Sequence, residues 1–330
     1  MRLSRVPNAV KDPPPAVSAV SAVAFDVPLP AHLARFGTSV RAGLCGADDA
    51  PLVVVLGGIS ADCFPCARPD GERGWWSGLT AAGCALDPRD VRILGVDFIA
   101  DADGRCAPTT ADQAAVIVAA LDRLGVARAK AIVGASYGGM IALSLGQHFP
   151  DRVERLVVVS ADARPHPAST AIRELQRRVV ALGIAGGTPD EALSIARGLA
   201  MLTYRTRDEF AERFAGGIDE EDVLSRSEPG RYLRARGDTF CEMMSPERFQ
   251  SLSASIDRHR VDPARIAHPT LLIGAASDQL VPPVQMESLA ERLAGPAELH
   301  LLPSLYGHDM FLKDAAAFSP LVRAFLKAAP

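Results

Sequence analysis

A serine flanked by glycines gives the first indication of chemistry in this sequence. Ser136 lies in the segment Gly134-Ala-Ser-Tyr-Gly138, between an apolar run that ends near Val133 and a helical pattern that begins near Tyr137. At a strand–turn–helix junction this spacing forms a nucleophile elbow, which exposes the serine hydroxyl on a strained turn. The helix start also favours negative charge beside the serine. We therefore predict that Ser136 is a nucleophile; an ordinary glycine turn is the alternative.

A serine hydroxyl becomes nucleophilic when a base takes its proton and an acid orients that base. After an elbow serine, the acid and then the histidine follow along the chain. Asp278 comes after the apolar run 270–274, and His308 comes after the run 299–302. Because parallel strands end at one edge of a sheet, we expect Asp278 and His308 to lie beside Ser136 there.

Other histidines and acids fit these roles less well. Asp262 precedes its strand, and Glu287 falls inside a predicted helix, so Asp278 is the preferred acid. The competing histidines lie near the start of the chain, at a helix end, in the middle third, or before or within a strand: His32, His148, His166, His259, His268 and His300. Only His308 combines a late position with a loop after a strand.

Two backbone N–H groups are needed to stabilise negative charge on an attacked carbonyl oxygen. One is expected from Tyr137, directly after the serine. The other is expected from the loop after the apolar run 51–56, where Gly57-Gly58-Ile59-Ser60 follows. Ile59 is the predicted donor and Gly58 the alternative. A simple β-turn without this role is the competing interpretation.

Short apolar runs rich in Val, Ile and Leu recur along the chain without strict alternation. Such runs are typical of strands covered on both faces, as in a parallel sheet. Predicted strands lie at 51–56, 91–96, 129–133, 153–159, 270–274 and 299–302, and predicted helices at 110–124, 141–149, 286–293 and 315–328. The alternation predicts an α/β fold with a mostly parallel, doubly wound sheet covered by helices.

This alternation breaks between about residues 163 and 266. The stretch has helical patterns at 170–182, 190–203, 207–214 and 246–256, and no convincing strand. We therefore predict a sheet domain interrupted by a helical lid insert. The predicted divisions are a flexible leader with a first strand (1–30), the first part of the core (31–162), the insert (163–266) and the second part of the core (267–330).

Composition and charge exclude several classes of protein. The chain has 330 residues, 48% hydrophobic and 22% charged, which suits a globular protein with a core. A net charge of −4 argues against nucleic-acid or anionic-membrane partners. No apolar run reaches the roughly 20 residues that span a bilayer. In the leader, Pro13-Pro14-Pro15 precedes the apolar stretch, which favours a cytoplasmic protein over an exported one.

Six cysteines are too few for a disulfide scaffold in a chain of this length. Cys63-Phe-Pro-Cys66 is a single CxxC pair, whereas a four-ligand zinc site needs a second pair. We therefore expect two thiols in a loop and no metal site.

Several of these segments together resemble a known family, the homoserine O-acyltransferases of methionine biosynthesis, which have the α/β-hydrolase fold. The resemblance extends from about Pro51 to the C-terminus and includes the insert. It is carried by Ser136 with Gly138-Gly139-Met140, by Leu193–Arg197, by Met201–Thr206, and most specifically by Tyr306-Gly-His-Asp-Met-Phe-Leu312. Related serine O-acyltransferases share the pattern.

The resemblance implies an activity and further site residues. Ser136, Asp278 and His308 would form a Ser-His-Asp triad that moves an acetyl or succinyl group from acyl-CoA to L-homoserine. Arg197 matches the arginine that binds the amino-acid carboxylate, and Asp309 matches the aspartate that holds the amino group. No metal or bound cofactor is implied; the partners are small molecules, with a possible homodimer through the insert.

Departures from the family leave alternatives open. The family usually has a His-Ala-Leu-Thr-Gly-like loop where this chain has Gly57-Gly58-Ile59-Ser60, and Met or Phe where it has Tyr137. An esterase or thioesterase with the same triad, a serine O-acyltransferase and a non-enzymatic binding protein are the alternatives. A succinyl donor would need a cation in the pocket; Arg173, Arg177, Arg178 and Arg205 are available in the insert, without an indication of which one.

Overall fold

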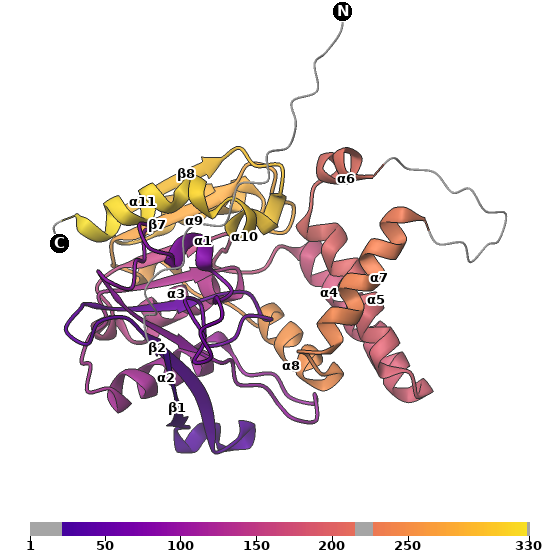
Figure 1. Cartoon of the computed structure of the whole chain (residues 1–330), viewed down its shortest axis with the longest axis horizontal. Helices are drawn as coiled ribbons and strands as arrows, with labels where there is room; N and C mark the ends of the chain where they lie inside the picture. The colour runs from indigo at the N-terminus through magenta and orange to yellow at the C-terminus, as the bar shows by residue number, and fades with distance from the viewer. Residues whose placement is uncertain (1–21, 215–226, 329–330) are drawn as a thin grey trace, which may run out of the picture.

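An eight-stranded sheet forms the centre of the computed structural model, which describes residues 22–214 and 227–328 (Figure 1). The strand order is β1-β2-β4-β3-β5-β6-β7-β8. β2 runs antiparallel to both of its neighbours, and all the other pairs are parallel. The strands are β1 (Ala22–Pro28), β2 (Ser39–Cys45), β3 (Leu52–Leu56), β4 (Arg92–Val96), β5 (Ala131–Ala135), β6 (Leu156–Val159), β7 (Thr270–Ala275) and β8 (Ala297–Leu302). The predicted α/β fold with a mostly parallel sheet is confirmed.

The antiparallel strand β2 is the one strand of this sheet that the sequence patterns did not predict. Its residues alternate between exposed and buried at the start and include Arg41 and Gly43, so no apolar run marks it. β1, by contrast, falls within the predicted leader and first strand. Residues 1–21 of that leader lie outside the described residues.

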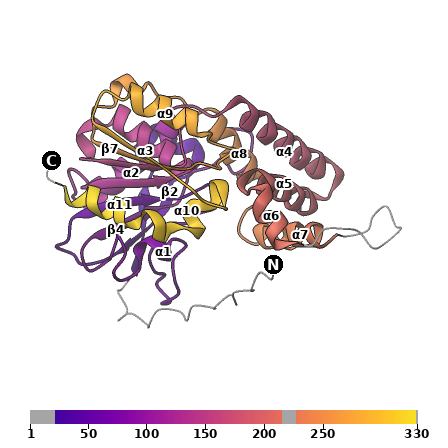
Figure 2. The same cartoon turned by 90° about the horizontal axis from the view of Figure 1, so that it is seen from above.

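Helices cover both faces of the sheet (Figure 2). α2 (Thr110–Arg123), α3 (Tyr137–His148) and α9 (Pro283–Arg292) contribute to the apolar core on one face, and α1 (Ser77–Thr80), α10 (Met310–Lys313) and α11 (Ala315–Lys327) to the core on the other. In α2 the predicted stripe is buried, with Ala114, Ile117 and Leu121 at most 3% exposed. Burying one large apolar side chain stabilises the fold by about 1.5–3 kcal/mol, so these stripes hold the helices on the sheet.

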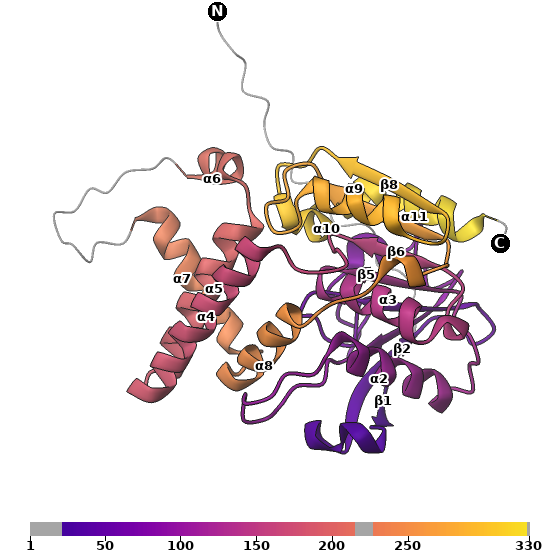
Figure 3. The ribbon, with the colours of Figure 1, turned by 180° about the vertical axis from the view of Figure 1, so that it is seen from behind.

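Between β6 and β7 the described residues, 160–214 and 227–269, form five α-helices beside the sheet domain (Figure 3). They are α4 (Pro167–Gly186), α5 (Pro189–Tyr204), α6 (Arg207–Arg213), α7 (Glu228–Cys241) and α8 (Pro246–Asp257). α4 packs against α5 and α8, and α5 packs against α7. The sequence did not predict α7, because Arg231, Arg234 and Arg236 interrupt its apolar pattern. The boundaries of the insert as a separate unit remain a prediction.

The CxxC spacing pairs Cys66 with Cys63, whereas in the structure the thiol of Cys66 contacts that of Cys45. Cys66 Sγ lies 3.1 Å from Cys45 Sγ on β2, and both thiols are free. No group of metal-binding side chains occurs among the described residues. Likewise, no helix within 22–214 and 227–328 is long and apolar enough to cross a membrane.

Candidate active site

Ser136 stands on a strained turn between β5 and α3. Its φ of 54° is one of two positive values at non-glycine residues of the described chain. The flanking glycines make the turn possible: a Cβ on Gly134 would lie 2.1 Å from the carbonyl oxygen of Gly138, and one on Gly138 would lie 2.5 Å from that of Leu56. These separations are far below van der Waals contact, so the elbow geometry depends on both glycines.

Three side chains from distant parts of the chain form a continuous hydrogen-bonded series. His308 Nε2 lies 2.9 Å from Ser136 Oγ, and His308 Nδ1 lies 2.8 Å from Asp278 Oδ2. His308 comes from the short 3-10 helix η4 (Gly307–Asp309), after β8. The imidazole can therefore take a proton from the serine through one nitrogen while the carboxylate fixes the other.

Backbone N–H groups hold the carboxylate of Asp278 in place. Its Oδ1 accepts hydrogen bonds from Leu280 N at 2.8 Å and Val281 N at 3.0 Å, which leaves Oδ2 for the histidine. The two alternative acids lie elsewhere. Glu287 is exposed on α9, and Asp262 caps the 3-10 helix η3 (Pro263–Arg265) by accepting from Ala264 N.

The environment of His308 favours a proton on the imidazole. Burial is the largest single influence and opposes the charge, but the negative charge of Asp278, its hydrogen bond and the charge of Asp309 together raise the pKa of His308 above its usual value. Arg173 acts in the opposite direction. The histidine is only 5% exposed, so these charges act with little screening by water.

The loop predicted to stabilise the oxyanion is tied to the elbow. Gly138 N donates to the carbonyl oxygen of Gly57 at 2.8 Å, which holds the loop after β3 against the start of α3. The N–H of Tyr137 is in the first turn of α3 and so has no acceptor within the helix. Ile59 and Gly58 follow in the same loop and are both partly exposed. Which of them donates stays a prediction.

Two hydrogen bonds hold the side chain of Tyr137, the residue that follows Ser136. Its hydroxyl lies 2.5 Å from Ser255 Oγ and accepts from Gln113 Nε2 at 3.1 Å. Complete burial raises the pKa of Tyr137 to about 12, against the effect of these hydrogen bonds, so the phenol stays neutral. Ser255 belongs to α8, so its hydrogen bond with Tyr137 joins the elbow to the insert.

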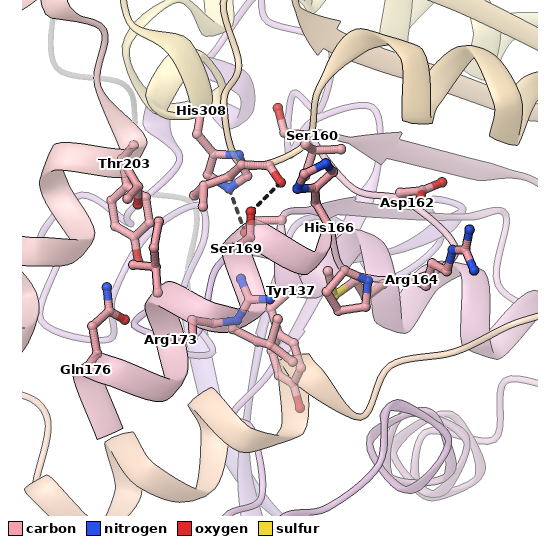
Figure 4. A pocket seen from close by; sticks show the side chains of 18 residues that line it. Tyr137, Ser160, Asp162, Arg164, His166, Ser169, Arg173, Gln176, Thr203 and His308 are labelled. Carbon is pink, nitrogen blue, oxygen red and sulfur yellow. Dashed lines mark hydrogen bonds between the residues drawn. The ribbon is translucent and has the colours of Figure 1, made fainter. Parts of the chain in front are cut away.

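A cavity opens in front of Ser136 and His308 (Figure 4). Its wall combines the segment after β6, which contributes Ser160 and Asp162, with the insert, which contributes Arg173 from α4 and Tyr204 from α5. The ring of Tyr204 lies 5.8 Å from that of His308, centroid to centroid. The insert therefore covers the imidazole and supplies part of the substrate side of the site.

The two predicted amino-acid ligands lie outside the lining of this cavity in the part of the chain that the structure describes. The guanidinium of Arg197 stacks on the rings of Tyr204 and Phe240, 5.4 and 4.7 Å from their centroids. Asp309 follows His308 directly, and its Oδ2 lies 3.3 Å from Arg205 Nε. Their roles in binding stay predictions.

Three charged residues of the cavity, Asp162, Arg164 and Arg173, had no assigned place from sequence. Asp162 is 7% exposed and accepts from Gln285 Nε2 at 2.9 Å; burial is the main reason that its pKa is raised. Arg173 was one of four candidate cations. No local motif marks these residues, since they reach the cavity through the packing of α4 and of the segment that follows β6.

Comparison with known proteins agrees with this architecture. A family model described as the alpha/beta hydrolase fold matches residues 75–315. Together with the strand order and the elbow, this match places the chain in the α/β-hydrolase fold class.

Its sequence is 40% identical to homoserine O-succinyltransferase of Xanthomonas campestris pv. campestris, over 97% of this chain and 87% of the relative. The chain belongs to the homoserine O-acyltransferase family. The family predicted from the motifs is therefore confirmed.

Solved structures of two kinds share the fold. Homoserine O-acetyltransferase from Bacillus anthracis superposes with a TM-score of 0.81 at 18% identity, covering 94% of this chain and 99% of that one. Esterase E22 superposes with the same TM-score at 20% identity, covering 93% of this chain and 100% of that one. At these identities the likeness concerns the fold alone, which does not distinguish transfer to an amino acid from ester hydrolysis.

Proposed function

We propose that this protein transfers an acyl group from acyl-CoA to the side-chain hydroxyl of L-homoserine, a step of methionine biosynthesis. The observation that carries the proposal is the unbroken Ser136–His308–Asp278 series in a chain 40% identical to a homoserine O-succinyltransferase. The acyl group is acetyl or succinyl. The triad has the geometry that acyl transfer through a serine ester needs.

In the first half-reaction Ser136 Oγ attacks the thioester carbonyl carbon of acyl-CoA. His308 Nε2 takes the hydroxyl proton as the bond forms, and Asp278 stabilises the resulting imidazolium. The N–H groups of Tyr137 and Ile59 bind the tetrahedral oxyanion, where loss of one donor typically costs about 100- to 1000-fold in kcat. The C–S bond then breaks, His308 protonates the CoA thiolate, and an acyl-serine remains.

In the second half-reaction the hydroxyl of homoserine attacks the acyl-serine. His308 takes the proton of that hydroxyl and returns it to Ser136 Oγ as the ester bond to the serine breaks. Arg197 is proposed to bind the homoserine carboxylate, and Asp309 its ammonium group. Because Asp309 already contacts Arg205, the ammonium shares this carboxylate with a guanidinium.

Water competes with homoserine for the acyl-serine, so the site must exclude it. The insert is proposed to act as the lid that does so. Tyr204 at the end of α5 lies over His308, and the backbone around it contacts η4: a Cβ on Gly307 would lie 2.8 Å from the carbonyl oxygen of Tyr204. This close cover favours acyl transfer over hydrolysis.

The insert is also the proposed surface of a homodimer. Large apolar side chains are exposed on two of its helices, at Leu175 and Leu182 on α4 and at Ile195, Leu199 and Leu202 on α5. Exposed apolar residues that recur along helices are typical of interaction surfaces.

We propose a cytoplasmic location, where acyl-CoA is available.

An assay of acyl donors against acceptors tests the function. Acetyl-CoA and succinyl-CoA are each supplied with homoserine, with serine or with no acceptor, and CoA release and ester formation are both measured. Homoserine-dependent formation of the O-acyl ester is expected. CoA release that is indifferent to every amino acid would instead identify a thioesterase, and preference for serine would identify a serine O-acyltransferase.

A further inference from the structure

One arginine of the insert lines the cavity that contains the reacting groups. Arg173 lies on α4 and lines the same cavity as Ser136 and His308. Figure 4 shows Arg173 on the side of α4, away from Asp162 and Arg164. Its positive charge influences the protonation of His308, so the guanidinium lies within electrostatic range of the imidazole.

The carboxylate of Asp257 on α8 fixes the guanidinium of Arg173. Asp257 Oδ1 lies 2.7 Å from Arg173 Nε and 2.6 Å from its Nη2. Asp257 Oδ2 also accepts from Arg177 Nη1 at 2.6 Å, and the same nitrogen donates to Ser253 Oγ at 3.0 Å. Two guanidinium groups therefore share one carboxylate, and the cluster carries a net positive charge.

This net charge is partly withdrawn from water. The side chains of Arg173, Arg177 and Asp257 are 13%, 21% and 11% exposed. Taking an uncompensated charge out of water costs free energy unless an opposite charge joins it. The cluster should therefore bind an anion that enters the cavity.

Arg173 also has the donors that an anion requires. Asp257 occupies its Nε edge, and Nη2 also donates to Thr170 Oγ1 at 3.4 Å, whereas Nη1 has no hydrogen bond or ion pair to any described residue. A guanidinium has five N–H donors, so both hydrogens of Nη1 remain for a second carboxylate, next to an Nη2 whose further contact with Thr170 is long. Such bidentate pairs are among the stronger and more geometrically selective hydrogen bonds in proteins.

The other cations near the cavity are less suited to this role. Arg164 lines the cavity but is exposed, so water screens its charge. Arg205 contacts Asp309 and Glu209, and Arg178 points to solvent. Arg197, which stacks on two aromatic rings, is already proposed to bind the homoserine carboxylate. Arg173 combines burial, a fixed orientation and available donors.

We propose that Arg173, held by Asp257 and supported by Arg177, binds the terminal carboxylate of a dicarboxylic acyl group, so that the donor is succinyl-CoA rather than acetyl-CoA. This inference rests on the proposed acyl transfer through Ser136. A succinyl group carries its second carboxylate two methylene groups beyond the reacting carbonyl, and the ester on Ser136 would direct that carboxylate across the cavity. Arg173 is thus a specificity-determining residue.

The test compares succinyl-CoA with butyryl-CoA, in which a methyl group replaces the carboxylate. At saturating acceptor, the wild-type protein should use succinyl-CoA with a kcat/KM about 10- to 100-fold above that of butyryl-CoA, as expected for a hydrogen-bonded charge pair. Arg173→Met should lower kcat/KM for succinyl-CoA by a similar factor and leave butyryl-CoA near its wild-type value. Arg178→Met, an exposed arginine on the same helix, should retain the wild-type preference.

Arg173→Lys keeps the charge and contact with Asp257 but removes the guanidinium edge. It should lower the preference for succinyl-CoA less than Arg173→Met does, and it gives a measurement even if the methionine variant does not fold. Equal loss of both donors in these variants, or a wild-type preference for butyryl-CoA, would overturn the inference. A rise in the KM of homoserine with unchanged donor preference would overturn it too, by assigning Arg173 to the acceptor. Failure of the proposed function itself would look different, because the wild-type protein would then form no amino-acid ester from any donor.

Discussion

The catalytic edge of the sheet and the helical insert enclose the same cavity, but different forces place their side chains. At the sheet edge, Ser136, Asp278 and His308 each follow a parallel strand, and close backbone contacts fix them. In the insert, Arg173 is placed by an ion pair between two helices, with Asp257 as its partner 84 residues further along the chain. We therefore propose that the edge determines the chemistry and that the insert determines which molecules undergo it.

This division predicts which substitutions should affect all substrates and which should affect only some of them. Substitutions at the edge should affect every substrate equally, since in the proposed mechanism all of them react through the same three groups. Substitutions in the insert should change one substrate relative to another. The following experiments test that separation, in order of decreasing expected effect.

Removing the nucleophile should have the largest effect. Ser136→Ala is expected to lower kcat by roughly 10⁶-fold with every donor, because the other members of the triad act through the serine. Mass spectrometry after mixing with acyl-CoA should detect no covalent adduct. Ser144→Ala, which changes a buried serine in α3, the helix that follows Ser136, is the matched control and should form the adduct normally. An adduct that persists in Ser136→Ala would contradict the assignment.

Asp278→Asn should lower kcat by roughly 10⁴-fold, because the amide favours the wrong tautomer of His308. The loss should be the same for both half-reactions, as measured by burst and steady-state kinetics. Glu287→Gln, which alters the exposed alternative acid on α9, should leave both rates unchanged. A larger effect at Glu287 would disprove the proposed triad.

Asp309 lies where the two regions meet, because it belongs to η4 and contacts Arg205 of the insert. The variant Asp309→Asn tests its proposed role. Loss of a charged hydrogen bond should lower kcat/KM for homoserine by about 10- to 100-fold, with less effect on formation of the acyl-enzyme.

The same variant also makes a prediction about pH. His308 acts as a base when neutral, so kcat/KM rises as pH increases through its pKa. Asp309 helps to raise that pKa, and the variant should therefore move the acidic limb to lower pH. An acidic limb at the wild-type position, with both half-reactions equally impaired, would indicate a purely structural role.

A pair of glycine variants compares the stability of the two regions. Gly138→Ala introduces a Cβ 2.5 Å from a backbone oxygen and should reduce the free energy of unfolding by about 1–3 kcal/mol. Gly186→Ala, at the end of α4, meets no atom within 4 Å and should raise stability by up to about 1 kcal/mol. Denaturant titration measures both. Similar effects at the two positions would argue against a tightly packed elbow beside a more tolerant insert.

The sequence predicted the catalytic edge better than the insert, for physical reasons. A strand followed by a glycine-flanked serine is a local pattern, and the parallel order of the strands brings Asp278 and His308 to the same edge. Strand β2 and helix α7 escaped prediction because neither has a clear apolar period. The place of Arg173 depends on how α4 packs against α8, and no local pattern encodes that packing.

The contact between Gly307 and Tyr204 has a consequence for protein engineering. Gly307 has a φ of 55°, and the carbonyl oxygen of Tyr204 leaves no room for a side chain there. The turn that carries His308 therefore packs directly against the last residue of α5. A chimaera that exchanges the insert for that of a relative should work only when residues 306–309 are exchanged with it.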